Sequence, residues 1–290
     1  MKWLVSLIGA ALVMVALRDL FHTLWHPTRR GGLSRHVMSV LWKLSQQFPL
    51  RKGAAGLAGP FAMVTVVAMW AGTVTLGWAL IYWPHLPDAF LFAADLKPAE
   101  HGGLVDALYI SLVTVATLGL GDIAPAEPWL RIVTPAEALV GFVLLTATVS
   151  WVLEIYPALT RRRALALRLS QLQRNDPSLL ELDSSAGAAI LDGLAAEVAR
   201  ICVDFLQYAE SYYFHDGADH TSLATRVRYA AELAARGGSA RHAEVRLAAS
   251  LLTTALADLA DILDERFLHT GGTVQDIYRA YAEDHDRSQM

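Results

Sequence analysis

The chain is poor in charge and almost without cysteine. Of its 290 residues, 18% are charged and 54% are hydrophobic, and its mean hydropathy is +0.35. This balance excludes an average soluble protein and indicates a membrane protein. The single cysteine, Cys202, rules out an intrachain disulfide. Because no nucleophile motif brings serine, histidine and aspartate together, we predict neither an enzyme nor a cofactor.

Acidic residues are missing from the segment between His26 and Gly56, which contains six basic residues. Loops of this kind stay in the cytoplasm, so we predict that it lies inside. Residues 1–157 carry 10 basic and 9 acidic side chains, whereas residues 158–290 carry 14 and 19. The second part is mildly acidic, and nothing in it indicates a nucleic-acid partner. Repeated arginines within a spanning segment are also lacking, which argues against a voltage sensor.

Three apolar runs are long enough to cross a bilayer, which takes about 20 residues. The first, residues 3–25, continues past Arg18 and Asp19, so we expect a retained helix rather than a cleaved signal. The second is the uncharged run 61–83, and the third ends near residue 156. Arginines 161–163 follow the third run and place the C-terminus in the cytoplasm. With three spans, the N-terminus is then outside.

An amphipathic helix is predicted between the first two spans. Its apolar residues recur at helical spacing on one face: Leu33, Val37, Leu41, Leu44 and Phe48. This pattern is typical of a helix that lies in the headgroup plane. It could couple gating motions to the membrane surface or serve as a passive connector.

The segment from Asp106 to Pro125 is predicted to form a short apolar helix followed by a loop with alternating glycines. The loop residues are Thr117, Leu118, Gly119, Leu120, Gly121 and Asp122. A row of carbonyl oxygens along such a loop can replace the water shell of K⁺, the permeant ion, and glycine allows the backbone that this requires. A glycine-containing loop after an amphipathic helix is the simpler alternative. The position between two membrane-length runs favours an ion-selectivity filter.

These residues resemble the filter T-V-G-Y-G-D of two-transmembrane pore-loop potassium channels. Leu118 replaces the usual valine and Leu120 the usual tyrosine, whose hydroxyl helps to hold the filter open. The sequence G-L-G-D also resembles the second filter of tandem-pore potassium channels. The resemblance covers residues 58–157 and implies potassium-selective conduction. One filter per chain requires three further copies of the chain, because the carbonyl cage takes four loops around one axis.

The third apolar run supplies the candidate gate. In the resembling channels a glycine hinge follows the filter aspartate at about the distance of Gly141, which favours a helix that starts at Pro128 over one that starts with a capping box at residues 134–137. Phe142, Leu145 and Val149 are then expected to face the cavity. Glu154 could form an acidic ring at the inner mouth or pair with a nearby arginine.

The remainder reads as helices. Residues 189–213 and 243–267 carry apolar stripes that suit a helical bundle. The nucleotide-binding motif that is common on prokaryotic potassium channels is missing, so an unidentified cytoplasmic ligand is the candidate regulator. His215 and His220 lie in a loop with metal-ligand residue types but without a recognised spacing, and no metal site other than the filter is predicted.

The sequence therefore predicts an all-α integral protein of the plasma membrane in three parts. Residues 1–57 hold the N-terminal spanning helix and the interfacial helix, residues 58–157 the pore module, and residues 158–290 a cytoplasmic helical domain. The leading hypothesis is a homotetrameric potassium channel in the lipid bilayer. The alternatives are a non-selective cation channel and a non-conducting membrane-anchored sensor or scaffold.

Overall fold

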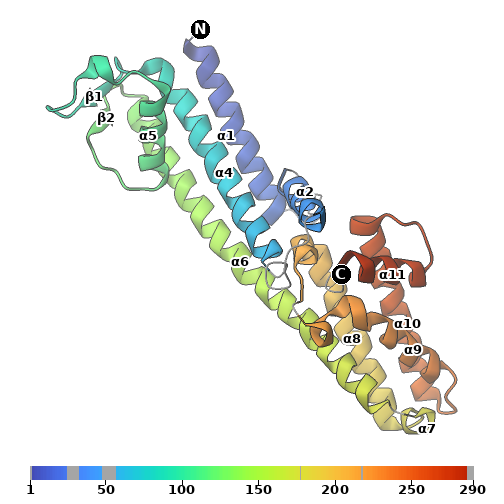
Figure 1. The fold of residues 1–290 in the computed structure, drawn as a ribbon. Coiled ribbons are helices and arrows are strands. Elements are labelled where there is room, and N and C mark those ends of the chain that lie inside the picture. Colours follow the sequence, from blue (N-terminus) through green and yellow to red (C-terminus); the bar gives the residue numbers. More distant parts are fainter. Residues whose placement is uncertain (1, 25–32, 48–56, 177, 217, 286–290) are drawn as a thin grey trace. The chain divides into compact units, whose positions relative to one another are not determined.

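The computed structural model describes residues 2–24, 33–47, 57–176, 178–216 and 218–285. The chain forms two compact units. The first consists of Met1–Val37 and Met63–Val152, and the second of Met38–Ala62 and Leu153–Met290. Figure 1 follows the elements along the chain and shows that nearly all of them are helices. This confirms the predicted all-α class.

Three helices are long and apolar enough to cross a membrane: α1 (Lys2–Leu24), α4 (Ala58–Tyr82) and α6 (Leu130–Asn175). Between α4 and α6 the chain forms the short strand β1 (Phe90–Phe92), the apolar helix α5 (Leu104–Val115) and the strand β2 (Ile123–Pro125). Short 3₁₀ turns lie at Trp83–His85 and Pro98–Glu100. Helices form here because long apolar runs at membrane depth must satisfy their own backbone hydrogen bonds.

The contacts of α1 with α4 explain how the first spanning helix accommodates an acidic residue. The Trp70 indole donates to the Asp19 carboxylate at 2.8 Å, and the Ser34 backbone N–H donates to it at 3.2 Å. Near the other end of α1, a Cβ added at Gly9 would lie 2.3 Å from the carbonyl oxygen of Gly77. Small residues at such crossings let two backbones approach closely. Helix α1, which the sequence predicted as a retained spanning helix, therefore packs against α4 within the first unit.

Helix α2 (Leu33–Gln47) confirms that a helix lies between the first two spans, although its buried face differs from the predicted stripe. Met38 and Trp42 are buried, whereas Leu44 is 42% exposed. The Trp42 indole donates to the Asp284 carboxylate at 3.0 Å, a partner 242 positions away that periodicity does not reveal. Phe48, the last residue of the predicted stripe, and the basic residues at 29, 30, 51 and 52 lie outside the described residues.

Helix α6 begins at Leu130, close to the earlier of the two predicted starts, and residues 134–137 lie inside it. It continues to Asn175, well beyond the expected end of the span near residue 156. The arginines at 161–163 were expected to end the membrane segment, and they do not end the helix. Arginine has a good helix propensity, so a change of environment from membrane to polar surroundings does not require a break.

The second unit is a helical bundle. Its helices are α7 (Leu179–Leu182), α8 (Ser185–Gln207), α9 (Leu223–Gly238), α10 (Ala243–Leu263) and α11 (Val274–His285), with the C-terminal part of α6. Short turns follow α8 at Ala209–Tyr213 and Asp219–Thr221, and a π-helical turn follows α10 at Asp264–Leu268. The predicted apolar stripe of residues 189–213 is buried, from Leu191 to Tyr212. The stripe on α10 is buried at Ala248, Leu252, Leu259 and Leu263.

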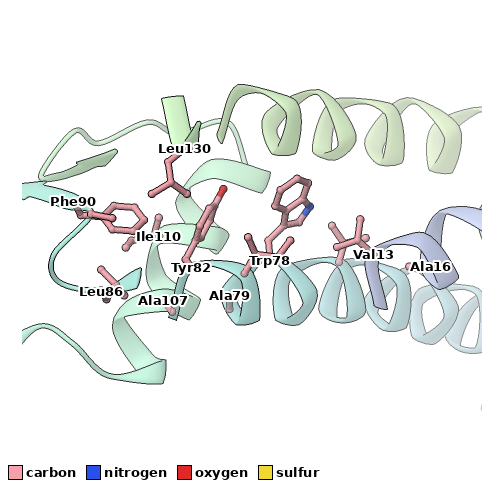
Figure 2. Packing of buried hydrophobic residues seen from close by; sticks show 13 residues of the cluster. Val13, Ala16, Trp78, Ala79, Tyr82, Leu86, Phe90, Ala107, Ile110 and Leu130 are labelled. Atoms are coloured by element: carbon pink, nitrogen blue, oxygen red, sulfur yellow. The ribbon is translucent and has the colours of Figure 1, made fainter. Parts of the chain in front are cut away.

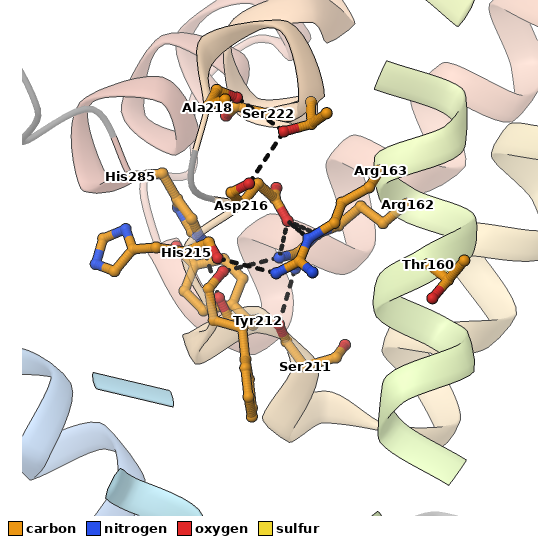
Figure 3. Close-up of polar contacts among 12 residues, drawn as sticks. Thr160, Arg162, Arg163, Ser211, Tyr212, His215, Asp216, Ala218, Ser222 and His285 are labelled. Atoms are coloured by element: carbon orange, nitrogen blue, oxygen red, sulfur yellow. Dashed lines mark hydrogen bonds and ion pairs between the residues drawn. The ribbon is translucent and has the colours of Figure 1, made fainter. Parts of the chain in front are cut away.

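A buried arginine ties α6 to the loop after α8. Figure 3 shows the Arg162 guanidinium between Asp216 and two backbone carbonyls. It lies 2.7 Å from the Asp216 carboxylate and donates to the carbonyls of Ser211 and Phe214 at 2.8 Å each. Both side chains of the ion pair are only 2% exposed. Arg163 also contacts the Asp216 carboxylate, at 3.3 Å. The carboxylate in the loop that contains His215 and His220 is therefore paired with two arginines.

We expect Asp216→Ala to destabilise the second unit by about 3–5 kcal/mol, because removing one partner leaves the other buried charge uncompensated. The exposed pair of Asp176 and Arg236 is the matched control, since its side chains are 67% and 39% exposed. Asp176→Ala should cost no more than about 1 kcal/mol. Denaturant unfolding of the full chain in detergent, followed by helical circular dichroism, measures both. Equal effects of the two variants would contradict the assignment.

Candidate functional site: the pore loop

The loop after α5 is positioned by the helix that precedes it. At the start of α5, the Gly103 backbone N–H donates to the Asp106 carboxylate at 3.0 Å, and the His101 ring lies 2.9 Å from the same side chain. A carboxylate in the first turn stabilises a helix by satisfying its free N–H groups. At the other end, Ala116 N–H donates to the Leu112 carbonyl at 3.0 Å, so α5 ends where the predicted filter begins.

The backbone of the loop alternates between left-handed and ordinary conformations. Thr117, Gly119 and Gly121 have φ angles of +57°, +56° and +79°. Glycine adopts this region without strain, whereas threonine in it carries a cost. The Leu118 N–H donates to the carbonyl of Val113 at 2.9 Å, which joins the loop to the last turn of α5. The glycine positions that the sequence singled out are thus the ones where the backbone needs them.

Asp122 is held from two sides. The Tyr109 hydroxyl of α5 donates to its carboxylate at 2.5 Å, and the backbone N–H of Ala93 donates to its carbonyl at 2.8 Å. Directly after it, β2 pairs antiparallel with β1, with Phe92 opposite Ile123. The outgoing end of the loop is therefore fixed both to α5 and to the segment that precedes α5.

Behind the loop, α5 packs between α4 and α6. Figure 2 shows Tyr82 and Trp78 of α4 with Ile110 of α5 and Leu130 at the start of α6 in one apolar cluster. Side chains from the same three helices, α4, α5 and α6, also form a polar contact. Glu137 of α6 receives a hydrogen bond from the Tyr82 hydroxyl at 2.5 Å and lies 2.6 Å from the Ser111 hydroxyl of α5. All three side chains are completely buried.

Gly141 marks the point where α6 crosses the end of α5. A Cβ at this position would lie 2.1 Å from the carbonyl oxygen of Val115 and 2.9 Å from its carbonyl carbon. Real Cβ atoms do not approach backbone atoms so closely, so any larger residue would have to push the two helices apart.

The other predicted site residues lie on free faces of the single chain. Leu118 and Leu120 are 65% and 63% exposed. Phe142, Leu145 and Val149 are exposed as well. Glu154 accepts a hydrogen bond from the Tyr208 hydroxyl at 2.7 Å, a partner that neither of the two sequence alternatives included. Among the described residues, no group of three or more metal-ligating side chains comes together.

Three residues of the site were not singled out from the sequence: Tyr109, Ser111 and Val115. They read as ordinary members of an apolar helix, and their contacts depend on residues 13 to 26 positions away. One signal was available for the network as a whole. Glu137 is the only charged residue between Ile132 and Leu153, and an ionisable residue inside a spanning run points to function by default.

Comparison with known proteins agrees with this geometry. Residues 72–156 match the family described as Ion channel. A segment of 56 residues is 45% identical to two-pore potassium channel 5 of Arabidopsis thaliana, covering 18% of this chain and 14% of that protein. A segment of 84 residues is 41% identical to two pore potassium channel c of Oryza sativa, covering 28% of this chain and 18% of that one. No solved structure matches the chain.

A longer similarity joins the chain to a bacterial protein. Over 160 residues it is 27% identical to the uncharacterized membrane protein YdjJ of Bacillus subtilis, which covers 54% of this chain and 46% of that protein. The chain thus spans less than half the length of these curated relatives. The fold and the loop define an integral membrane protein with a pore loop. The segment that matches the ion-channel family, residues 72–156, is the one that contains the loop and the helices on either side of it.

We expect Gly141→Ala to abolish or strongly reduce ion flux, because the added methyl collides with the end of α5 and displaces the loop. Gly72→Ala is the matched control, since a Cβ at Gly72 of α4 meets no atom within 4 Å. Flux through proteoliposomes that contain equal amounts of each variant measures the difference. Wild-type flux in Gly141→Ala would show that the contact with Val115 does not position the loop.

Proposed function

We propose that the chain is a potassium-selective channel in which four copies surround one conduction axis. The observation that carries the proposal is the backbone of residues 117–122, which alternates left-handed residues with ordinary ones at the end of a short membrane helix. Such a backbone suits a row of carbonyls directed at a desolvated cation. Two plant relatives of the pore module carry potassium channel in their names.

The side chains of the loop support a multimer. Leu118 and Leu120 are about two-thirds exposed in the single chain. They belong to an irregular loop, and no lipid should reach such a loop at membrane depth. In the proposed tetramer they pack outward against neighbouring subunits, while Asp122 sits at the outer mouth and attracts cations. Thr117 supplies a hydroxyl at the inner end.

The proposed gate lies below the filter. Phe142, Leu145 and Val149 of α6 line the cavity, and their exposure in the single chain agrees with that role. Gly141 is the proposed hinge, and its contact with Val115 means that bending there would act directly on α5. Glu154 is the candidate for a ring at the inner mouth, next to the Tyr208 hydroxyl.

The proposed orientation follows from charge. The segment before α4 is basic and lies inside, so the loop between α4 and α5 lies outside, with the N-terminus, and the helical bundle is cytoplasmic. We propose the residue ranges 1–57, 58–157 and 158–290 as functional parts, with an unidentified cytoplasmic ligand acting on the last.

A poorly selective cation channel is the second candidate, favoured by Leu120, which cannot supply the hydroxyl that tyrosine gives in the family filter. A comparison of potassium flux with sodium flux in liposomes distinguishes the selective channel from the poorly selective one. If neither ion passes, the remaining alternative is a non-conducting membrane-anchored sensor or scaffold.

For the filter itself, we expect Gly121→Ala to remove selective potassium flux while the protein still inserts. Alanine in the left-handed region costs about 1–2 kcal/mol per residue, and the tetramer would carry this strain four times around one axis. Gly72→Ala again serves as the control. Unchanged potassium flux and an unchanged potassium-to-sodium ratio in Gly121→Ala would rule out the filter assignment.

The oligomeric state can be measured independently of conduction. We expect the mass of the protein in mild detergent, after subtraction of the detergent, to be four times the chain mass of 31.6 kDa. One pore loop per chain requires this number. A conducting monomer or dimer would refute the tetramer.

A further inference from the structure

The environment of Glu137 indicates that this side chain does more than fill space between α4, α5 and α6. The Glu137 side chain is completely buried within one chain, in contact with Tyr82, which belongs to the apolar cluster of Figure 2. Its two oxygens contact the Tyr82 hydroxyl and the Ser111 hydroxyl. None of the ion pairs among the described residues involves Glu137, so its charge, if present, would have no cationic partner in the part of the chain that the structure describes. An isolated carboxylate in such surroundings is strongly unfavourable.

The number of hydrogen atoms around Glu137 bears on its charge. The Ser111 hydroxyl lies 2.9 Å from the Thr75 backbone carbonyl and 2.6 Å from Glu137 Oε1. A hydroxyl carries one hydrogen atom and a carbonyl can only accept. If Ser111 donates to Thr75, the short contact with Glu137 needs a proton on Oε1. A neutral carboxylic acid supplies it: Tyr82 donates to Oε2, the acid donates to Ser111, and Ser111 donates to Thr75.

The network lies beside the other contact between α5 and α6. Ser111 and Val115 are four residues apart on α5, and Glu137 and Gly141 are four residues apart on α6. Residues at this spacing share one helix face. Ser111 meets Glu137 and Val115 meets Gly141, so one face of each helix is joined twice over a single turn. The filter loop begins directly after Val115.

We propose that Glu137 is a neutral carboxylic acid that positions the pore helix and thereby the filter. This inference rests on the proposed function for its conduction readout, whereas the protonation state can be measured without conduction. Glu137 acts through Ser111 and Tyr82 and does not touch the permeant ion.

The protonation state is tested in the intact protein at neutral pH. We expect the infrared spectrum of the wild type to contain the carbonyl band of a protonated carboxylic acid, and this band to vanish in Glu137→Gln. Glu100→Gln is the control, because Glu100 is exposed and paired with Lys97 at 3.0 Å; it should leave the band in place. A wild-type spectrum that Glu137→Gln does not change in this region would overturn the neutral acid, whatever the flux. The ¹³C chemical shift of the Glu137 carboxyl in the wild type gives the same answer if the variant fails to insert.

The positioning role is tested by rescue. Glutamine keeps an acceptor for Tyr82 and a donor for Ser111, so Glu137→Gln should conduct potassium within about twofold of the wild type. Alanine removes the group that joins Tyr82 to Ser111, and Glu137→Ala should lose roughly tenfold or more of the flux or its selectivity. If Glu137→Ala does not reach the membrane, Ser111→Ala takes its place, with a loss in the same direction. Equal flux in the glutamine and truncated variants would overturn the positioning role. A wild type without any flux would instead refute the proposed function, while the spectrum still decides the protonation state.

Discussion

The position of the pore loop depends on the close crossing of α6 over the last turn of α5. Gly141 leaves no room for a side chain between the helices, so the Val115 carbonyl sits against the α6 backbone. One turn away, Glu137 joins the same two helices by a short contact with Ser111. A steric contact and a polar contact constrain different directions of movement. Together they fix both the separation and the rotation of α5 relative to α6. The loop that follows Val115 is positioned by α5 and therefore by these two contacts.

The loop is also held at its far end, by an arrangement that suits its altered sequence. Leu120 cannot make the hydrogen bond that tyrosine makes in the family filter. In this chain the hydroxyl comes from the pore helix instead, where Tyr109 donates to Asp122. The antiparallel pair of β1 and β2 then carries the chain away from the loop. A hydrogen bond from a hydroxyl on α5 therefore joins the helix to the end of the loop.

Much of this arrangement could be predicted from local sequence. Long apolar runs predict the spanning helices, and the glycine spacing predicts the positive φ of Gly119 and Gly121, because both follow from chemistry at the positions themselves. The positive φ of Thr117 was not predicted. Contacts between distant residues could not be predicted in this way. Asp122 was predicted only as the last residue of the filter loop, and its hydrogen bond to Tyr109 was not foreseen. Trp42 was not among the residues of the predicted apolar stripe, and its hydrogen bond to Asp284 appears only in the fold. The length of α6 was underestimated because arginine ends a membrane run without ending a helix.

Within the single chain the polar side chains around Glu137 have hydrogen-bond partners, whereas the apolar side chains of the loop are exposed. Tyr82, Ser111 and Glu137 are completely buried without help from another copy, as a residue in the bilayer core requires, because water is absent there. Leu118 and Leu120 remain exposed in the single chain, and in the proposed tetramer they pack against neighbouring subunits. In the proposed tetramer, association would then not need to supply a partner to Glu137, Tyr82 or Ser111, because these side chains already have partners within the chain. Van der Waals packing of the exposed residues would drive it, as is usual between helices in membranes, and the geometry of the filter would be set by a pore helix that each subunit has already fixed in place.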